Sequence, residues 1–236
     1  MAPVKRGATS HADSPPSSAD STVAVKHRKT SPLKRARLTV DPSEVTLVTT
    51  MDEHRLPLAE ADVLYHPTFV SEDLANKWYR QMLDAPGSFA TDPALVVKYS
   101  GQVVDMQYDY PPVLKEIQDL LESRLGVRFN HCMANLYEDG KVYIGNHRDN
   151  RENRVIASLS LGAPRTFIMR HDSLTKATKS DLQAPDEPLL YKKWLLGNGS
   201  LVVQQGRTQE KWKHEIPKEP KVKQGRISLT FRQLVF

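Results

Sequence analysis

Short segments in which apolar and polar residues alternate fill the chain from residue 129 to residue 236, and no helical pattern separates them. Successive side chains of a β-strand point to opposite faces, so this period of two predicts strands with one buried face. Many short strands in succession favour two packed sheets of the sandwich or jelly-roll type. Six strands are predicted in the segments "FNHCMANLY" (129–137), "RVIASLSLG" (154–162), "RTFIMRH" (165–171), "GSLVVQQ" (199–205), "KWKHEIP" (211–217) and "GRISLTFRQLVF" (225–236).

Two helices are predicted before this region. Ser71 is placed to cap a helix that runs to about Leu83. A second helix begins at Pro112, and Gly126 is placed to end it. The apolar stripes of both helices read as core, and the fold class is therefore mainly β with flanking helices. Ordered structure is expected to begin near "EVTLV" (44–48) and "VLYHPTFVS" (63–71), and the polar stretch 172–188 is expected to be an exposed loop.

Residues 1–40 have a composition unlike that of the rest of the chain. They are rich in Ser, Pro, Thr and Ala, and they carry eight Lys/Arg against two Asp, a net charge of +6. Because the whole chain has a net charge of +5, the remainder is close to neutral at −1. Such a segment buries too little apolar surface to order itself, so a disordered basic tail is predicted. Its "KHRKTSPLKRAR" has two basic clusters, which suggest nuclear import; a solvated basic linker is the alternative.

The remaining bulk features narrow the class of protein. One folded domain is expected over residues 41–236. The single cysteine, Cys132, excludes an internal disulfide and a zinc site of paired cysteines, and it favours a reducing compartment. No apolar run approaches the ~20 residues that cross a bilayer, so a soluble protein without a secretory signal is expected.

The run "GNHRDN" (145–150) contains a candidate metal site. If this run is extended, His147 and Asp149 project to the same side and can hold one ion. A third ligand must come from another strand, and His214 in "KWKHEIP" is the best candidate. Two imidazoles and one carboxylate suit ferrous iron with open coordination positions, and zinc is the competitor. Taken alone, such a His–Asp pair is more often a hydrogen-bonded loop pair than a metal site.

The last predicted strand strengthens the site hypothesis. In "RISLTFR" one face is wholly apolar, whereas the other carries Arg226, Ser228, Thr230 and Arg232. Arginine is the side chain best shaped to hold a carboxylate through two hydrogen bonds. We expect both arginines to turn toward one dicarboxylate ligand. Asn135 and Tyr137 share a face of another predicted strand and are expected to add hydrogen bonds to that ligand.

Five motifs in order, "NLYEDG", "HRD", "IASLSLGAPRTFIMRH", "WKHEIP" and "RISLTFR", resemble the AlkB family of Fe(II)- and 2-oxoglutarate-dependent dioxygenases, most closely its DNA- and RNA-demethylating branch. The resemblance is strong over residues 129–236 and vague over 44–128. It implies a double-stranded β-helix core at 129–236, preceded by a nucleotide-recognition region within 41–128. The implied iron ligands are His147, Asp149 and His214.

The resemblance also implies roles around the iron. Arg226 is similar to the family arginine that pairs with the distal carboxylate of 2-oxoglutarate, and Arg232 to the one near its iron-chelating end. Asn135 and Tyr137 resemble auxiliary contacts to this co-substrate. The implied reaction uses Fe(2+), 2-oxoglutarate and O2, hydroxylates an N-methyl group, and releases formaldehyde and succinate.

Substrate contacts are less sharply implied. Tyr99, in a "YS" that resembles the family's nucleotide lid, is a candidate platform for a flipped base, as are Tyr108 and Tyr110; core packing is the alternative for all three. Arg165 falls on a family arginine and serves either phosphate contact or the fold.

One position departs from the family pattern. The residue two positions after the iron-binding aspartate is usually acidic in members that accept methylated adenine and cytosine, but here it is Arg151. We expect the next residue, Glu152, to take its place.

These observations predict a nuclear oxidative demethylase of alkylated DNA or RNA, with a cytoplasmic pool as an addition, no membrane association, and a monomer as the expected state. Two alternatives remain: a family member that acts on a protein or another methylated substrate, and an inactive nucleic-acid-binding module.

Overall fold

The computed structural model describes residues 47–95, 97–99, 102–174 and 187–235. The basic tail with its proposed import signal lies outside these residues, as does most of the loop predicted at 172–188. No helix in the described part is both long enough and apolar enough to cross a membrane.

Short strands dominate the described residues. The elements in chain order are η2 (Asp52–His54), β1 (Asp62–His66), α1 (Glu72–Met82), β2 (Gly87–Ala90), β3 (Lys98–Tyr99), β4 (Gln102–Val103), β5 (Met106–Gln107), α2 (Pro112–Leu125), β6 (His131–Tyr137), β7 (Ile144–His147), β8 (Asn153–Gly162), β9 (Arg165–His171), β10 (Tyr191–Leu196), β11 (Leu201–Gln205), α3 (Thr208–Lys211), β12 (Trp212–Ile216) and β13 (Arg226–Leu234).

Two sheets form the body of the molecule. The larger has the strand order β1-β11-β8-β13-β6-β2-β5, and the smaller has the order β10-β9-β12-β7. Neighbours are antiparallel except β2 and β5. β13 lies between β8 and β6, so every residue of "RISLTFR" (226–232) pairs with a strand on each side. The mainly β fold with a jelly-roll core is confirmed.

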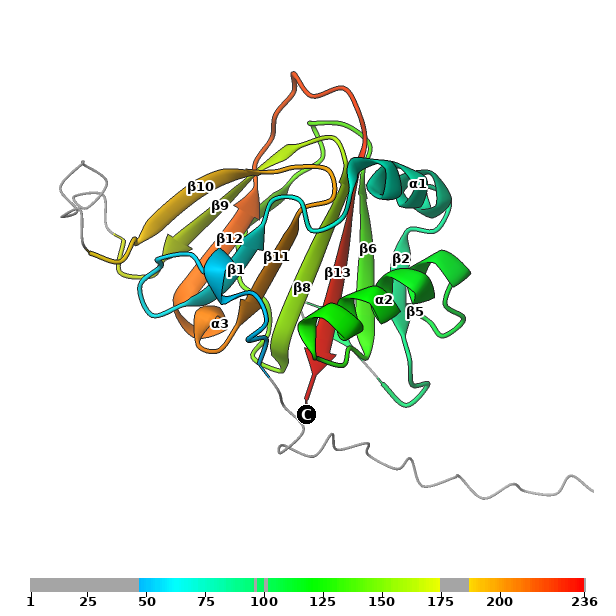
Figure 1. The fold of residues 1–236 in the computed structure, drawn as a ribbon, viewed down its shortest axis with the longest axis horizontal. Coiled ribbons are helices and arrows are strands. Elements are labelled where there is room, and N and C mark those ends of the chain that lie inside the picture. The colour runs from blue at the N-terminus through cyan, green and yellow to red at the C-terminus, as the bar shows by residue number, and fades with distance from the viewer. Residues whose placement is uncertain (1–46, 96, 100–101, 175–186, 236) are drawn as a thin grey trace, which may run out of the picture. The chain divides into compact units, whose positions relative to one another are not determined.

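Helices α1 and α2 cover one face of the larger sheet (Figure 1). Ser71 caps α1 by accepting a hydrogen bond from the Leu74 N–H. Gly126 ends α2 in the left-handed conformation, with φ of 68°, and donates its N–H to the Glu122 carbonyl. Both predicted helices are thereby confirmed. Their apolar stripes and the apolar face of β13 form one buried core, which leaves the other face of β13 for a site.

The differences from the predicted strands lie mostly at sheet edges. β1 to β5, β7 and β10 were not predicted as strands. β2 to β5 and β7 are two to four residues long, β1 lies in a segment for which only ordered structure was expected, and β10, "YKKWLL", has a half-exposed pattern. The described residues of "EVTLV", Leu47 and Val48, are not in a strand. Val48 is nevertheless fully buried, and both its N–H and its carbonyl bond to the Gln205 amide.

Candidate metal centre

A cavity of about 550 Å³ lies between the two sheets. The larger sheet supplies the polar face of β13 together with residues of β6, β8 and β11. The smaller sheet supplies residues of β7, β9, β10 and β12. The lining residues are Met133, Asn135, Tyr137, Ile144, Gly145, Asn146, His147, Asp149, Ile156, Ser158, Phe167, Leu196, Val202, Gln204, His214, Ile216, Arg226, Ser228, Thr230 and Arg232.

Three of these side chains form a candidate metal site. His147 ends β7 and stands directly opposite His214 of β12 in the antiparallel register. The two imidazole rings have centroids 4.4 Å apart, and His147 Nε2 lies 3.8 Å from Asp149 Oδ1. One ligand atom from each of the three residues lies within 4.8 Å of the others. Sheet pairing therefore brings together residues that are 67 positions apart in the sequence.

The hydrogen bonding of His147 and the protonation of His214 fit metal binding. The Gly145 carbonyl oxygen lies 2.9 Å from His147 Nδ1, which must donate to it, so Nε2 is the ring nitrogen left to bind a metal. Burial lowers the pKa of His214 to about 4, with Asp149 opposing this shift. His214 is thus neutral at pH 7, the form that a metal requires. The donor set of two imidazoles and one carboxylate is that of non-haem Fe(II) oxygenases.

Arg226 lies in the floor of this cavity and is only 1 % exposed. Its Nη2 donates to the Ser160 and Ser228 hydroxyls at 3.0 and 3.2 Å, and its guanidinium lies 4.9 Å from the centre of the Tyr137 ring. Within the described residues its Nε and Nη1 have no hydrogen-bond partner. Burial lowers the Arg226 pKa, yet a guanidinium remains charged in proteins. A buried cation with two donors left over fits a carboxylate ligand.

Arg232 lies on the same face of β13 as Arg226, close to the three candidate metal ligands. Its Nη2 is 3.3 Å from Asp149 Oδ2, and both side chains are buried. The guanidinium therefore helps to hold the carboxylate that would bind the metal. Asn135 and Tyr137 line the cavity from β6, where they pair in register with Ser228 and Arg226.

The candidate base platforms do not form one cluster. Of Tyr99 the structure describes only the backbone, in the β3–β4 hairpin. Tyr108 is 42 % exposed, whereas Tyr110 packs edge-on against Phe89 and contacts the core. For Tyr110 the core alternative is the one that the structure favours.

Arg165 serves the fold. It is 1 % exposed, and it donates to the Glu219 carboxylate and to the carbonyls of Asp139, Val142 and Pro217. These contacts favour support of the fold over phosphate contact for this buried guanidinium, which joins β9 to the loops after β6 and β12.

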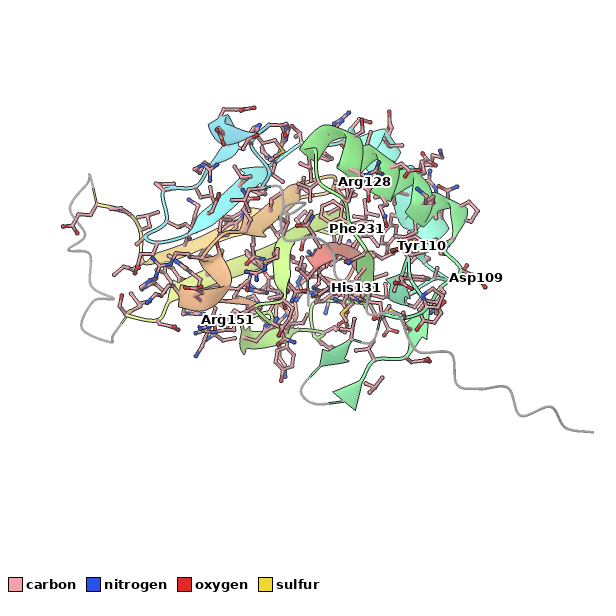
Figure 2. The ribbon with its side chains drawn as sticks, turned by 90° about the horizontal axis from the view of Figure 1, so that it is seen from below. Asp109, Tyr110, Arg128, His131, Arg151 and Phe231 are labelled. Atoms are coloured by element: carbon pink, nitrogen blue, oxygen red, sulfur yellow. The ribbon has the colours of Figure 1, made fainter. Side chains whose placement is uncertain are left out.

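Arg151 and Glu152 are exposed in the turn between β7 and β8, and neither lines the cavity. Figure 2 labels Arg151 apart from the interior residues His131 and Phe231. The structure therefore does not bring either residue into the cavity with the three candidate ligands.

Several cavity residues were missed by the sequence analysis. Phe167 of β9 lies 5.4 Å from the His214 ring, and Gln204 of β11 is buried beside the cavity. The period of two along their strands would have shown their shared faces, but it does not say which face meets a cavity rather than the core.

Comparison with known proteins gives a consistent result. The model of the 2OG-Fe(II) oxygenase superfamily matches residues 65–232. The human DNA oxidative demethylase ALKBH2 is 33 % identical over 166 residues, which cover 67 % of this chain and 59 % of that protein. The human alpha-ketoglutarate-dependent dioxygenase alkB homolog 3 is 33 % identical over 138 residues, covering 57 % of this chain and 46 % of that protein. The chain thus matches less than two thirds of the length of these relatives.

A prolyl-4-hydroxylase structure from Pseudomonas putida aligns over 72 % of this chain and 92 % of its own, with 16 % identity and a TM-score of 0.42. The superfamily match covers more than half of the chain and includes all three candidate ligands. The chain therefore belongs to the 2OG-Fe(II) oxygenase superfamily, and the AlkB family membership indicated by its motifs is confirmed by these relatives.

Proposed function

We propose that this protein is an Fe(II)- and 2-oxoglutarate-dependent oxidative demethylase of N-alkylated bases in DNA or RNA. The observation that carries the proposal is one cavity with a three-ligand site at one end and a buried, incompletely bonded arginine in its floor. The names of the ALKBH2 and alkB homolog 3 relatives support the substrate class.

His147, Asp149 and His214 are the proposed iron ligands. Bound there with 2-oxoglutarate, iron supplies oxygen activation coupled to oxidation of the 2-oxo acid to succinate and carbon dioxide. The chain's own contribution is positioning and the exclusion of side reactions. The Gly145 carbonyl fixes the His147 tautomer, and Arg232 orients the Asp149 carboxylate.

Arg226 is the proposed partner of the distal carboxylate of 2-oxoglutarate. Its free Nε and Nη1 donors are preorganised by the Ser160 and Ser228 hydroxyls, which hold Nη2. A charge-assisted pair in so buried a place is stronger than one in water. Asn135 and Tyr137 are proposed as further contacts to the co-substrate.

The methylated base is proposed to approach beside β7. Gly145 and Asn146 are exposed and also line the cavity, and the His147 side chain is 30 % exposed, so the ligand site is accessible from this side. A base in a duplex must leave the stack to reach such a site, or arrive in a single strand. Hydroxylation of its N-methyl group gives an unstable hydroxymethyl product, which releases formaldehyde.

The test is product release by the purified chain with ferrous iron and 2-oxoglutarate. Oligonucleotides that carry 1-methyladenine or 3-methylcytosine are compared with unmethylated oligonucleotides of the same sequence. The proposal expects formaldehyde and succinate in equal amounts, and only with the methylated strands. Succinate without formaldehyde would retain the oxygenase and reject the nucleobase substrate. Binding of the strands without either product would favour the inactive binding module.

A further inference from the structure

The short helix α3 connects β11 to β12, the strand that carries His214 (Figure 1). It also contacts the segment that carries Asp149. Gln209 Oε1 accepts a hydrogen bond from the Asp149 backbone N–H at 3.2 Å. The Glu210 carbonyl accepts a second from Arg148 Nη1 at 2.6 Å. Two successive residues of the segment are therefore bonded to two successive residues of α3.

Gln209 occupies this position at an energetic cost. Its side chain is 4 % exposed, and within the described residues its Nε2 has no hydrogen-bond partner. A buried amide donor without a partner destabilises the fold, whereas an apolar side chain of similar size would avoid that cost. What glutamine supplies and leucine does not is the acceptor for the Asp149 N–H.

The helix is itself fixed to the body of the molecule. The Thr208 hydroxyl accepts from the Asp62 N–H at 2.9 Å and donates to the Gln205 carbonyl at 2.7 Å. At the other end of α3, the Trp212 indole N–H donates to the Ala59 carbonyl at 2.8 Å. Because Thr208 and Trp212 are both buried, the two ends of α3 are fixed in the fold. Residues that bond to α3 are therefore held in a fixed position.

We propose that Gln209 is a positioning residue for the metal site, acting through the backbone of Asp149; this rests on the ligand assignment of the proposed function. Arg232 bonds to the Asp149 carboxylate, and Gln209 bonds to its main-chain N–H. Since α3 leads directly into β12, the same element sets the position of His214. Arg148 strengthens the connection through Glu210.

The experiment measures Co²⁺ affinity by titration calorimetry on the full chain, with no 2-oxoglutarate or nucleic acid present. Gln209→Leu is expected to weaken Co²⁺ binding by roughly 10- to 100-fold, the effect typical of losing a group that orients a metal ligand. Gln209→Glu keeps an acceptor oxygen and is expected to bind more tightly than Gln209→Leu. Gln118→Leu is the matched control: Gln118 of α2 is 3 % exposed, and its Nε2 donates to the Glu122 carboxylate and the Phe129 carbonyl, so its loss should lower Tm and leave the affinity unchanged.

Wild-type Co²⁺ affinity in folded Gln209→Leu would overturn the proposal, because Gln209 would then serve only the fold. If Gln209→Leu does not fold, Arg148→Met decides, since the Arg148 side chain is 31 % exposed. Its affinity should fall several-fold, and Asp172→Asn, which removes only the Arg148–Asp172 ion pair, should not reproduce the fall. Unchanged affinity in Arg148→Met would reject the proposal.

These outcomes are separate from those of the demethylation assay. A chain that binds Co²⁺ in a Gln209-dependent manner but leaves methylated strands intact would retain this proposal and reject the substrate. A wild-type chain that does not bind Co²⁺ would reject the ligand assignment and this proposal together.

Discussion

His131 is a buried titratable group and the first residue of β6, where it pairs with Arg232 of β13. It is 0 % exposed, and within the described residues neither ring nitrogen has a hydrogen-bond partner. Burial first, and then the charge of Arg232, lowers its pKa to about 3, against the opposing effect of Asp149. Folding therefore requires the neutral imidazole, whereas the unfolded chain binds a proton below pH 6.5.

We expect the metal-free protein to lose stability as the pH falls from about 6.5 toward 4. Stability contributed by a lowered pKa is complete above the unfolded value, and each such histidine withdraws up to ~1.4 kcal/mol per pH unit below it. His214 adds to the slope in the metal-free state. Urea unfolding at pH 7, 6 and 5 measures this slope. His131→Leu should reduce it, and an equal slope in both proteins would show that His131 does not cause it.

Replacing His147 with alanine should abolish turnover and metal binding while the fold remains. The ring is partly exposed, and its hydrogen bond goes to a neighbouring carbonyl, so its loss leaves no large cavity. Titration with Co²⁺ measures the loss of metal binding, and a thermal melt measures whether the fold is retained. Retained turnover in His147→Ala would remove this residue from the ligand set.

Arg226→Gln should raise the KM for 2-oxoglutarate by roughly 10- to 100-fold, because a hydrogen bond to a charged group contributes about 1.5–3 kcal/mol. Co²⁺ affinity in the absence of 2-oxoglutarate should not change. Within the described residues Arg226 donates to Ser160 and Ser228, and not to the three candidate ligands. The pair of measurements distinguishes co-substrate binding from metal loading. An unchanged KM would place the distal carboxylate elsewhere.

At the scale of elements, the turn after β6 depends on Gly140. Its N–H donates to the Val222 carbonyl, its carbonyl accepts from the Glu219 N–H, and a Cβ at this position would overlap the Glu219 carbonyl. Gly140→Ala should therefore destabilise the protein by about 1–3 kcal/mol, as overpacking does. Gly197→Ala is the control, because a Cβ there meets no atom within 4 Å. Thermal melts of the two variants compare them, and equal Tm values would contradict this account.

The elements also show what the sequence could predict. Ser71, Gly126 and the apolar stripes predict α1 and α2, and alternation predicts the six strands β6, β8, β9, β11, β12 and β13. β7 contains "IGNH", which has no apolar alternation, because it is an edge strand whose residues face a cavity and solvent. Local pattern reports burial, so it does not reveal an edge strand such as β7, whose residues face a cavity and solvent.

The candidate site also has features that the sequence could predict and features that it could not. The even face of β13 and the His147–Asp149 spacing are periodic features that a sequence displays, whereas the Gln209–Asp149 bond joins residues 60 positions apart. That bond follows from where α3 lies in space. For Arg165 the sequence left phosphate contact and support of the fold as alternatives, and only its burial and its bond to Glu219 favour support of the fold.

At the scale of the whole molecule, residues 1–40 differ from the remainder of the chain in net charge. Residues 1–40 carry a net +6, and the other 196 residues carry −1. Deleting them should weaken oligonucleotide binding at low salt equally for methylated and unmethylated strands, and should reduce the dependence of affinity on salt. Binding isotherms at several salt concentrations test this, with Tm as the control. A loss confined to methylated strands would mean that the tail recognises the lesion.

The three candidate ligands also differ in their access to water. The His147 side chain is 30 % exposed, that of Asp149 is 3 % exposed, and His214 is 9 % exposed. A chelator competing for the ion can therefore replace His147 first, while the other two still hold it. Because β7 is an edge strand that pairs with β12 in the described part of the chain, this step would need one edge strand to fray and would leave the core intact. If the ion is held as proposed, its lifetime on the protein is expected to follow hydrogen exchange at β7 rather than global unfolding.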